Sequence, residues 1–186
     1  AISKVFAYHS VIHYRDAYGL YACNGILFNH ESPRRGVNFV TKKIVQGLVR
    51  IKQGKQKVLT LGNLYSRRDW GHANDYVESM WKILQQKKAN DFVVATKTSN
   101  SVKDFINICA KKLNLKLIWK NKGLKEIAIN KLTNKIIIKV DQKFFRETEV
   151  DNLIGDFSKA KKMLKWKPKY SFDKLIDDMI YDELND

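Results

Sequence analysis

The sequence lacks the features that mark a membrane, secreted or disulfide-bonded protein. No apolar run approaches the roughly 18 residues that a membrane-spanning helix needs. Lys4 and the polar residues after it interrupt any candidate signal-peptide core. Only two cysteines are present, Cys23 and Cys109, and each lies inside an apolar segment. We therefore expect a cytoplasmic protein with no membrane partner, in which both cysteines are buried free thiols.

Local catalytic and nucleotide-binding patterns are also missing. The sequence contains no G-x-G-x-x-G segment and no P-loop, so it carries no nucleotide-binding fingerprint of its own. It contains neither the G-x-S-x-G turn of serine hydrolases nor a C-x-x-C pair. His9 and His13 have the i, i+4 spacing of metal ligands, but no third ligand is nearby, so we predict no metal site.

Positive charge is the strongest signal in the composition. The 186 residues carry a formal net charge of +16, which suits a polyanionic partner such as nucleic acid or a nucleotide. The lysines are spread over the whole chain, however, and form no long run of like charges. We therefore expect most of them to lie on exposed faces without a nucleic-acid partner.

Helical and strand-like apolar patterns alternate along the chain, which predicts an α/β fold. Amphipathic stretches predict helices at 2–18, 40–51, 75–87, 102–113 and from Ser171 onward. Short apolar runs predict strands at 20–28, 58–61, 92–95, 115–119, 127–129 and 136–140.

Three of the predicted helices have recognisable start signals. Asn38 is the expected cap of the second helix, and Ser101 with Asp104 forms a capping box before the fourth. A similar pair, Asp75 and Glu78, is expected to begin the third helix. The third helix should then face inward with its apolar residues Val77, Met80, Trp81 and Leu84.

Two polar, basic segments each follow a predicted strand. They are N-H-E-S-P-R-R-G at 29–36 and R-R-D-W-G-H at 67–72. Open α/β folds bind phosphate ligands at the ends of buried strands, so these segments indicate a phosphorylated ligand. The alternative is that both are solvated connections with surface arginines, since loops are polar by default. The residues alone do not name a reaction.

Several segments resemble one family of enzymes. Residues 27–36 look like the loop after the catalytic helix of extended short-chain dehydrogenase/reductases that act on nucleotide sugars. Residues 68–77 resemble the R-D-[WF]-x-x-x-x-D-x-[VA] signature of that superfamily, and 164–168 resemble its L-G-W-x-P segment, with Lys165 in place of the glycine. The run 18–36 and the segment 145–156 narrow the resemblance to the GDP-mannose 4,6-dehydratase family.

The resemblance implies the C-terminal part of an extended short-chain dehydrogenase/reductase. Such a part holds the end of a Rossmann-like sheet and a smaller substrate-binding α/β domain. Residues 1–36 would be a remnant of the dinucleotide-binding domain, with the catalytic helix, a strand and the cofactor loop. Residues 37–186 would be mainly the nucleotide-sugar-binding portion, with some segments returning to the Rossmann-like domain. The dinucleotide fold and a catalytic Tyr, Thr and Glu would lie upstream, so we expect this chain alone to be inactive.

The implied activity is that of an NADP-dependent hydro-lyase acting on GDP-mannose. A hydride leaves C4 of the sugar, water is lost across C5 and C6, and the hydride returns to C6. The product is GDP-4-keto-6-deoxymannose, and the cofactor is regenerated in every cycle. The complete enzyme is expected to be a homo-oligomer, a dimer or a tetramer.

The resemblance also assigns roles to individual residues. Lys4 matches the Lys of the family's Tyr-x-x-x-Lys pair, which is catalytic and contacts the cofactor ribose. His30 and Arg35 match contacts to NADP. The positions that match contacts to the GDP-sugar are Asn29, Val40, Lys43, Arg68, Arg146 and Glu149. Arg68 and Arg146 would clamp the pyrophosphate, and Glu149 would accept hydrogen bonds from a ribose hydroxyl.

Two alternatives stay open at this point. One is a relative with another reaction, such as a nucleotide-sugar epimerase or reductase of the same superfamily. The other is a basic nucleic-acid-binding module. The tryptophans argue against the second alternative, because they lie in helix-core or motif positions rather than in an exposed stacking row.

Overall fold

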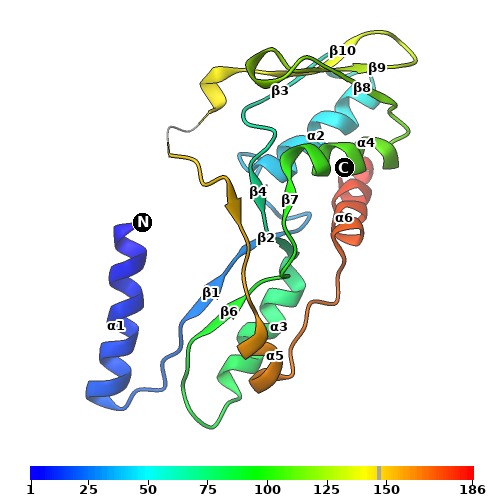
Figure 1. The fold of residues 1–186 in the computed structure, drawn as a ribbon. Coiled ribbons are helices and arrows are strands. Elements are labelled where there is room, and N and C mark those ends of the chain that lie inside the picture. The colour runs from blue at the N-terminus through cyan, green and yellow to red at the C-terminus, as the bar shows by residue number, and fades with distance from the viewer. Residues whose placement is uncertain (146–147) are drawn as a thin grey trace. The chain divides into compact units, whose positions relative to one another are not determined.

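The chain divides into two compact units, each assembled from segments that are distant in the sequence. The computed structural model describes residues 1–145 and 148–186 (Figure 1). Unit 1 comprises Ala1–His30, Asp69–Thr98 and Ile154–Tyr170. Unit 2 comprises Glu31–Arg68, Ser99–Leu153 and Ser171–Asp186.

A two-stranded parallel sheet lies at the centre of unit 1. Strands β1 (Gly25–Leu27) and β6 (Phe92–Val94) pair in parallel. Helices α3 (Ala73–Leu84) and α5 (Ser158–Leu164) contact β6 and each other. The core of the unit consists of Tyr76, Ile83, Phe92, Val94, Ala160, Leu164 and Trp166.

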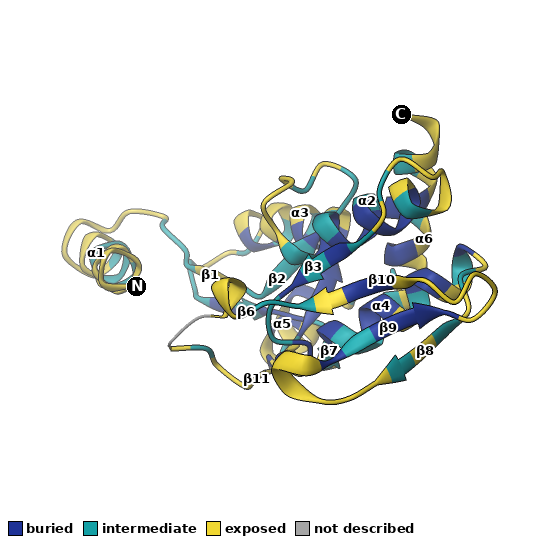
Figure 2. Cartoon of the chain, turned by 90° about the horizontal axis from the view of Figure 1, so that it is seen from above, coloured by how far each residue is buried: buried dark blue, intermediate teal, exposed yellow. Residues whose placement is uncertain are grey.

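Helix α1 (Ile2–Tyr18) belongs to unit 1 and confirms the helix predicted at 2–18. It carries no buried residue (Figure 2). Arg15 attaches it to the unit, because its two terminal amines donate to the carboxylate of Asp91 at 2.8 and 3.1 Å. The hydrogen bond from Arg15 lowers the pKa of Asp91. As predicted, α1 ends at Gly19, whose φ of 65° lies in the left-handed region.

The strand predicted at 20–28 is wrong in length and in burial. Only Gly25–Leu27 forms β1, and Asn29–Glu31 forms a separate strand, β2, which pairs with β5 (Trp70–His72). Leu20, Tyr21 and Ile26 are exposed. The reason is that β1 has a single partner strand among the described residues, so its apolar side chains are covered on few sides.

Unit 2 combines a four-stranded mixed sheet with three long helices. The strand order is β3-β10-β9-β8, in which β10 pairs in parallel with β3 and antiparallel with β9. These strands are β3 (Leu59–Leu61), β8 (Leu117–Lys120), β9 (Ile127–Asn130) and β10 (Ile136–Val140). The strands predicted in these regions are confirmed: 136–140 has the predicted bounds, and the boundaries of the other three shift by at most two residues.

The helices of unit 2 are α2 (Val40–Lys52), α4 (Val102–Lys112) and α6 (Phe172–Asn185). They contact one another in pairs, and α2 also contacts β3. Gly47 permits this last contact, because a Cβ atom there would lie 2.7 Å from a methyl carbon of Leu59. Two short 3-10 helices, Gly123–Lys125 and Gln142–Phe144, complete the unit.

A second, small sheet in unit 2 carries one of the predicted basic segments. Its order is β11-β4-β7, with β4 (Arg67–Arg68) between β11 (Asn152–Leu153) and β7 (Asn100–Ser101). Arg67 and Arg68 therefore lie on a strand and not on the loop expected from the sequence. The pairing with β11 and β7 fixes β4 from both sides, and on the β11 side the peptide N–H of Arg67 donates to the carbonyl of Asp151 at 2.8 Å.

Helix starts show where local sequence signals hold and where they fail. The capping box of Ser101 and Asp104 is confirmed in both directions, since each side chain accepts from the other residue's backbone N–H. The cap of α2 is Phe39 rather than Asn38, and it makes no side-chain capping bond. The cap of α3 is His72, whose Nδ1 accepts from the N–H of Asn74, so the predicted start at Asp75 and Glu78 is wrong.

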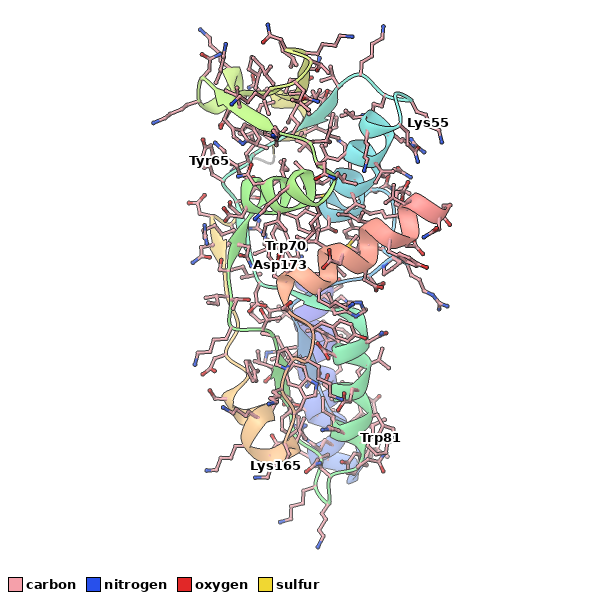
Figure 3. All side chains as sticks on the ribbon, turned by 90° about the vertical axis from the view of Figure 1, so that its right-hand side faces the viewer. Lys55, Tyr65, Trp70, Trp81, Lys165 and Asp173 are labelled. Carbon is pink, nitrogen blue, oxygen red and sulfur yellow. The ribbon has the colours of Figure 1, made fainter. Side chains whose placement is uncertain are left out.

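The predicted inward face of α3 is also wrong. Its four apolar members are exposed, and Trp81, labelled in Figure 3, is 63% exposed. The buried residues of α3 are Asp75, Tyr76, Ser79 and Ile83. The helix is turned this way because Asp75 must reach backbone N–H groups at 169 and 170, and Tyr76 must enter the core.

Both cysteines are free, as predicted, although only Cys109 is buried and Cys23 is partly exposed. Burial raises the pKa of the Cys109 thiol to about 12, so this residue is an unreactive core side chain. Within the described residues, no group of His, Cys, Asp or Glu is arranged to hold a metal ion. None of the described helices is long and apolar enough to cross a bilayer.

Lys165 occupies a backbone position that favours glycine. It ends α5 with φ 51° and ψ 33°, in the left-handed region, at the place where the L-G-W-x-P pattern has its glycine (Figure 3). A side chain in this region crowds its own carbonyl, and glycine avoids that cost. The departure from the pattern therefore leaves the fold intact but places strain at the end of α5.

Replacing Lys165 by Gly should stabilise the protein. We expect the free energy of unfolding to rise by about 0.5–1 kcal/mol, because relief of the left-handed strain exceeds the added freedom of glycine in the unfolded chain. Lys162→Gly is the matched control, since Lys162 is exposed inside α5 and its replacement should lower stability. Chemical denaturation followed by tryptophan fluorescence measures both. A loss of stability in Lys165→Gly would contradict the assignment of strain.

Candidate nucleotide-sugar and cofactor site

The predicted site residues are divided between the two units. Lys4, Asn29 and His30 belong to unit 1, and Arg35, Val40, Lys43, Arg68 and Glu149 belong to unit 2. Arg146 lies outside the described residues, so its predicted role is not addressed by the structure. Within unit 2, three small groups of side chains form around the predicted positions.

Arg68 and Glu149 form the first group. One terminal amine of Arg68 lies 3.5 Å from a carboxylate oxygen of Glu149. The other terminal amine donates to the carbonyls of Arg67 and Val150, at 2.7 and 2.5 Å. These bonds fix the guanidinium beside the 149–150 backbone, although the two segments are far apart in the sequence. The structure thus places together two residues that the sequence assigned to the same ligand.

The second group surrounds the first turn of α2. Val40 is the first helical residue, and Lys43 lies one turn later, with its Nζ 3.8 Å from the centroid of the Phe144 ring. Lys143 lies over the same ring at 4.9 Å. Burial, and then the charge of Lys143, lower the pKa of Lys43. No acidic residue lies in the first turn of α2, so positive charge gathers at the positive end of the helix dipole.

Arg35 lies in the third group, together with three residues that sequence reasoning did not single out. Its Nε lies 3.1 Å from Oε2 of Glu31, and its guanidinium carbon lies 3.5 Å from the centroid of the Phe39 ring. Glu31 also accepts a hydrogen bond of 2.6 Å from the hydroxyl of Thr41. The only sequence signal for this group is the i, i+4 spacing of Glu31 and Arg35 inside the 29–36 segment.

In unit 1, His30 is held by the backbone and by a ring contact. Its Nδ1 lies 2.9 Å from the carbonyl of Phe28, and its ring centroid lies 5.1 Å from that of Tyr76. A carbonyl can only accept, so Nδ1 carries the proton and Nε2 is the atom left for a ligand. Lys4 is exposed on α1, one turn from the start of the chain.

Asp69, the acidic residue of the R-D-W segment, has a structural role. It is fully buried in unit 1, where one carboxylate oxygen accepts from the N–H and the hydroxyl of Thr96, at 2.8 and 2.6 Å. The other accepts from the N–H groups of Lys97 and Gly155, at 2.9 and 3.2 Å. Asp69 thus joins three segments of the chain and has no room for a substrate.

Asp75 links two of the sequence patterns, the R-D-W signature at 68–77 and the L-K-W-K-P segment at 164–168. Its carboxylate accepts from the N–H groups of Lys169 and Tyr170, at 3.0 and 3.1 Å. Its carbonyl accepts from the indole N–H of Trp166 at 2.9 Å. These three bonds join the end of the R-D-W signature to the L-K-W-K-P segment and the two residues after it, and they leave the Asp75 carboxylate in a structural role.

Comparison with known proteins identifies the family. The family model described as GDP-mannose 4,6 dehydratase matches residues 1–179. The chain belongs to this family. The GDP-mannose 4,6-dehydratase of Dictyostelium discoideum is 48% identical over 180 residues, which are 97% of this chain and 51% of that protein. GDP-mannose 4,6-dehydratase 1 of Arabidopsis thaliana is 52% identical over 99% of this chain and 46% of its own length. The human enzyme is 47% identical over 96% of this chain and 48% of its own length.

These GDP-mannose 4,6-dehydratase relatives confirm the resemblance inferred from the sequence. The chain spans about half the length of the curated relatives it matches. The solved structure of RMD from Pseudomonas aeruginosa complexed with NADPH superposes on the whole chain with a TM-score of 0.80, at 18% identity, and the match covers 55% of that chain. A dTDP-glucose 4,6-dehydratase from Bacillus anthracis, in complex with NAD, gives a TM-score of 0.74 at 16% identity over 97% of this chain and 50% of its own. The predicted α/β fold class is confirmed.

Removing the charge of Asp69 should destabilise the protein severely. Asp69→Asn retains the shape but turns an amide N–H₂ toward N–H donors, so buried donors lose their acceptor. We expect a loss of about 2–4 kcal/mol in the free energy of unfolding. Asp16→Asn, at a 71% exposed carboxylate of the same unit, is the control and should change stability little. Denaturant titration of both variants is the measurement, and equal losses would contradict the structural role of Asp69.

Proposed function

We propose that this chain is the nucleotide-sugar-binding part of an NADP-dependent GDP-mannose 4,6-dehydratase. The complete enzyme consists of this chain together with a dinucleotide-binding half. It eliminates water from GDP-mannose to give GDP-4-keto-6-deoxymannose, and it works as a homo-oligomer. Unit 1 belongs with the dinucleotide-binding domain, and unit 2 forms most of the nucleotide-sugar-binding domain.

The pairing of Arg68 with Glu149 carries the proposal. A guanidinium group is a planar donor suited to the oxygens of a pyrophosphate, and a carboxylate accepts hydrogen bonds from ribose hydroxyls. Placed side by side, the two groups could contact the pyrophosphate and the ribose of one nucleoside diphosphate. In unit 2 they are neighbours on fixed backbone, with the Arg68 guanidinium anchored to the Val150 carbonyl. The relatives of about 48% identity, which are named GDP-mannose 4,6-dehydratases, support GDP-mannose as the substrate.

The first turn of α2 supports the same ligand. Val40 supplies a backbone N–H at the helix start, and Lys43 supplies a cation whose ring contact keeps it near that end. An anionic group gains both the helix dipole and this charge. Burial, and then the charge of Lys143, lower the pKa of Lys43, and a bound anion would offset both effects.

The cofactor proposal depends on Arg35, His30 and Lys4. A nicotinamide cofactor supplies hydride transfer when it is bound. Arg35 suits an anionic dinucleotide because its guanidinium is held between Glu31, at its Nε, and the Phe39 ring. His30 offers Nε2, since its Nδ1 faces the Phe28 carbonyl. Lys4 provides the cation that would lower the pKa of the catalytic Tyr, which the resemblance places four residues before Lys4, one helical turn away.

Activity distinguishes the roles of the two halves. The purified chain, incubated with NADP and GDP-mannose, should form no 4-keto-6-deoxy product, because the hydride carrier's fold and the catalytic Tyr belong to the other half. The complete enzyme should form it. Product from the chain alone would refute the proposal that the cofactor fold and the catalytic Tyr lie in the other half. Epimerisation or reduction by the complete enzyme, without loss of water, would instead assign it to another reaction of the superfamily.

Arg68→Lys should weaken substrate binding in the complete enzyme. Lysine keeps the charge but loses the planar donor pair, so we expect the Kd for GDP-mannose to rise about tenfold, or about 1.4 kcal/mol. The Kd for NADP should hardly change. Arg67→Lys is the matched control, because adjacent residues of a strand point to opposite faces and Arg67 pairs with Asp104 instead.

Calorimetric titration with GDP, GDP-mannose and NADP, together with thermal denaturation, separates the possible outcomes. GDP should report the same loss as GDP-mannose, since Arg68 is assigned to the pyrophosphate. Parent-like affinity of Arg68→Lys for GDP would show that Arg68 is a structural or surface residue. Equal weakening in Arg67→Lys would show that the effect is not specific to the face of β4 that carries Arg68.

A further inference from the structure

Glu31 is a buried carboxylate to which neither the sequence nor the proposed reaction gives a task. It is 2% exposed at the end of β2. Its Oε2 accepts from the Thr41 hydroxyl at 2.6 Å and lies 3.1 Å from Nε of Arg35. Burial raises the pKa of Glu31, whereas Thr41 and Arg35 act in the opposite direction. A carboxylate in such a position is costly unless its partners compensate, so its presence calls for a role.

The Arg35 side chain is constrained on two sides. Glu31 lies at its Nε edge, and the Phe39 ring covers one face of the guanidinium at 3.5 Å from the centroid. The Nε–H does not point directly at Oε2, so the pair is held by charge rather than by an aligned hydrogen bond. In 1–145 and 148–186, neither terminal amine of Arg35 has a hydrogen-bond partner. The free edge is the one that can bind an oxyanion with two parallel donors.

The local backbone explains why this arrangement involves Arg35 and not the adjacent Arg34. The N–H of Arg35 donates to the carbonyl of Ser32 at 2.9 Å, and the N–H of Arg34 lies 3.2 Å from the Ser32 hydroxyl. This turn directs Arg35 back toward Glu31, four residues earlier. Arg34 is exposed, with no side-chain contact in the described part of the chain.

We propose that Glu31 and Phe39 are positioning residues, which hold Arg35 with its terminal amines ready for a phosphate oxygen of the dinucleotide cofactor. This inference rests on the proposed function, because it assumes that Arg35 faces the cofactor. A free arginine side chain must lose much rotational freedom when it binds a phosphate, and one already fixed on two sides loses less. Thr41 contributes by holding Glu31 in the orientation that faces Nε.

The inference predicts a specific loss of cofactor affinity in the complete enzyme. Glu31→Gln and Phe39→Leu should each raise the Kd for NADPH about fivefold or more, because Arg35 is no longer fixed on that side. The Kd for GDP should stay within about twofold, since Arg68 and Glu149 are untouched. Phe39 is half-exposed, so Phe39→Leu should fold even if Glu31→Gln is unstable.

A double-mutant cycle tests whether Glu31 acts through Arg35. In the Arg35→Ala background, Glu31→Gln should change the Kd for NADPH by less than about twofold, because the group it positions is gone. Glu126→Gln is the matched control. Glu126 is 1% exposed and ion-paired with Lys103 in the same unit, so its loss should cost stability without changing NADPH affinity.

Fluorescence titration with NADPH, calorimetric titration with GDP and thermal denaturation supply the readouts. Parent-like NADPH affinity in both Glu31→Gln and Phe39→Leu would overturn the inference. So would an equal loss in Glu126→Gln, or an undiminished effect of Glu31→Gln in the Arg35→Ala background. If the unaltered enzyme does not bind NADPH, the proposed function itself fails and the inference with it. The two failures are therefore distinguished by the unaltered enzyme.

Discussion

A single buried carboxylate, that of Asp69, holds together the part of unit 1 from which the site segments depart. Four donors converge on it, from Thr96, Lys97 and Gly155. The approach is close enough that a Cβ atom on Gly155 would lie 2.4 Å from that of Ala95. Arg68 immediately precedes Asp69 in the sequence. Residues 149–153 immediately precede Ile154, where the chain re-enters unit 1 next to Gly155. The anchoring of Asp69 therefore fixes, within unit 1, the two points of the chain that directly follow the segments containing Arg68 and Glu149.

The family's sequence signatures consist largely of such anchors. In the R-D-W-G-H-A-x-D run, Asp69 and Asp75 bind backbone N–H groups, Trp70 is buried and His72 caps α3. Among these residues, Arg68 is the one whose side chain contacts another candidate ligand-binding residue, Glu149. A signature can thus be specific for a family of enzymes and yet contain mostly residues that position one reactive or binding group.

Features caused by residues close together in the sequence could be predicted, and features caused by distant residues could not. The capping box of Ser101 and Asp104 is made by residues three apart, and it was predicted correctly. The buried face of α3 was predicted wrongly. Asp75 is buried because it accepts from the backbone N–H groups of residues 169 and 170, which lie far from α3 in the sequence. An apolar pattern alone assigned Trp81 to the core, whereas that face is exposed in this chain.

The candidate site shows the same division between local and distant causes. Resemblance supplied the residue names, and the spacing of Arg68 and Glu149 in the sequence gave no reason to expect them in one group. Glu31 was missed because a glutamate in a polar basic segment looks like a surface residue. The role proposed for it depends on burial and on the Phe39 ring, neither of which the residue types predict.

The two site arginines of unit 2 share a feature that the net charge of +16 does not suggest. Each faces a glutamate, Glu31 for Arg35 and Glu149 for Arg68, although acidic residues are outnumbered 19 to 35 in the chain. A lysine-rich surface attracts anions without orienting them, because each ammonium is a mobile point charge. A guanidinium paired with a carboxylate has a fixed plane, and in Arg35 it also has, among the described residues, a free edge. The overall charge can therefore concentrate anions near the protein without orienting them, whereas the Arg–Glu pairs present donors of fixed orientation, which is why the proposed binding roles rest on these pairs.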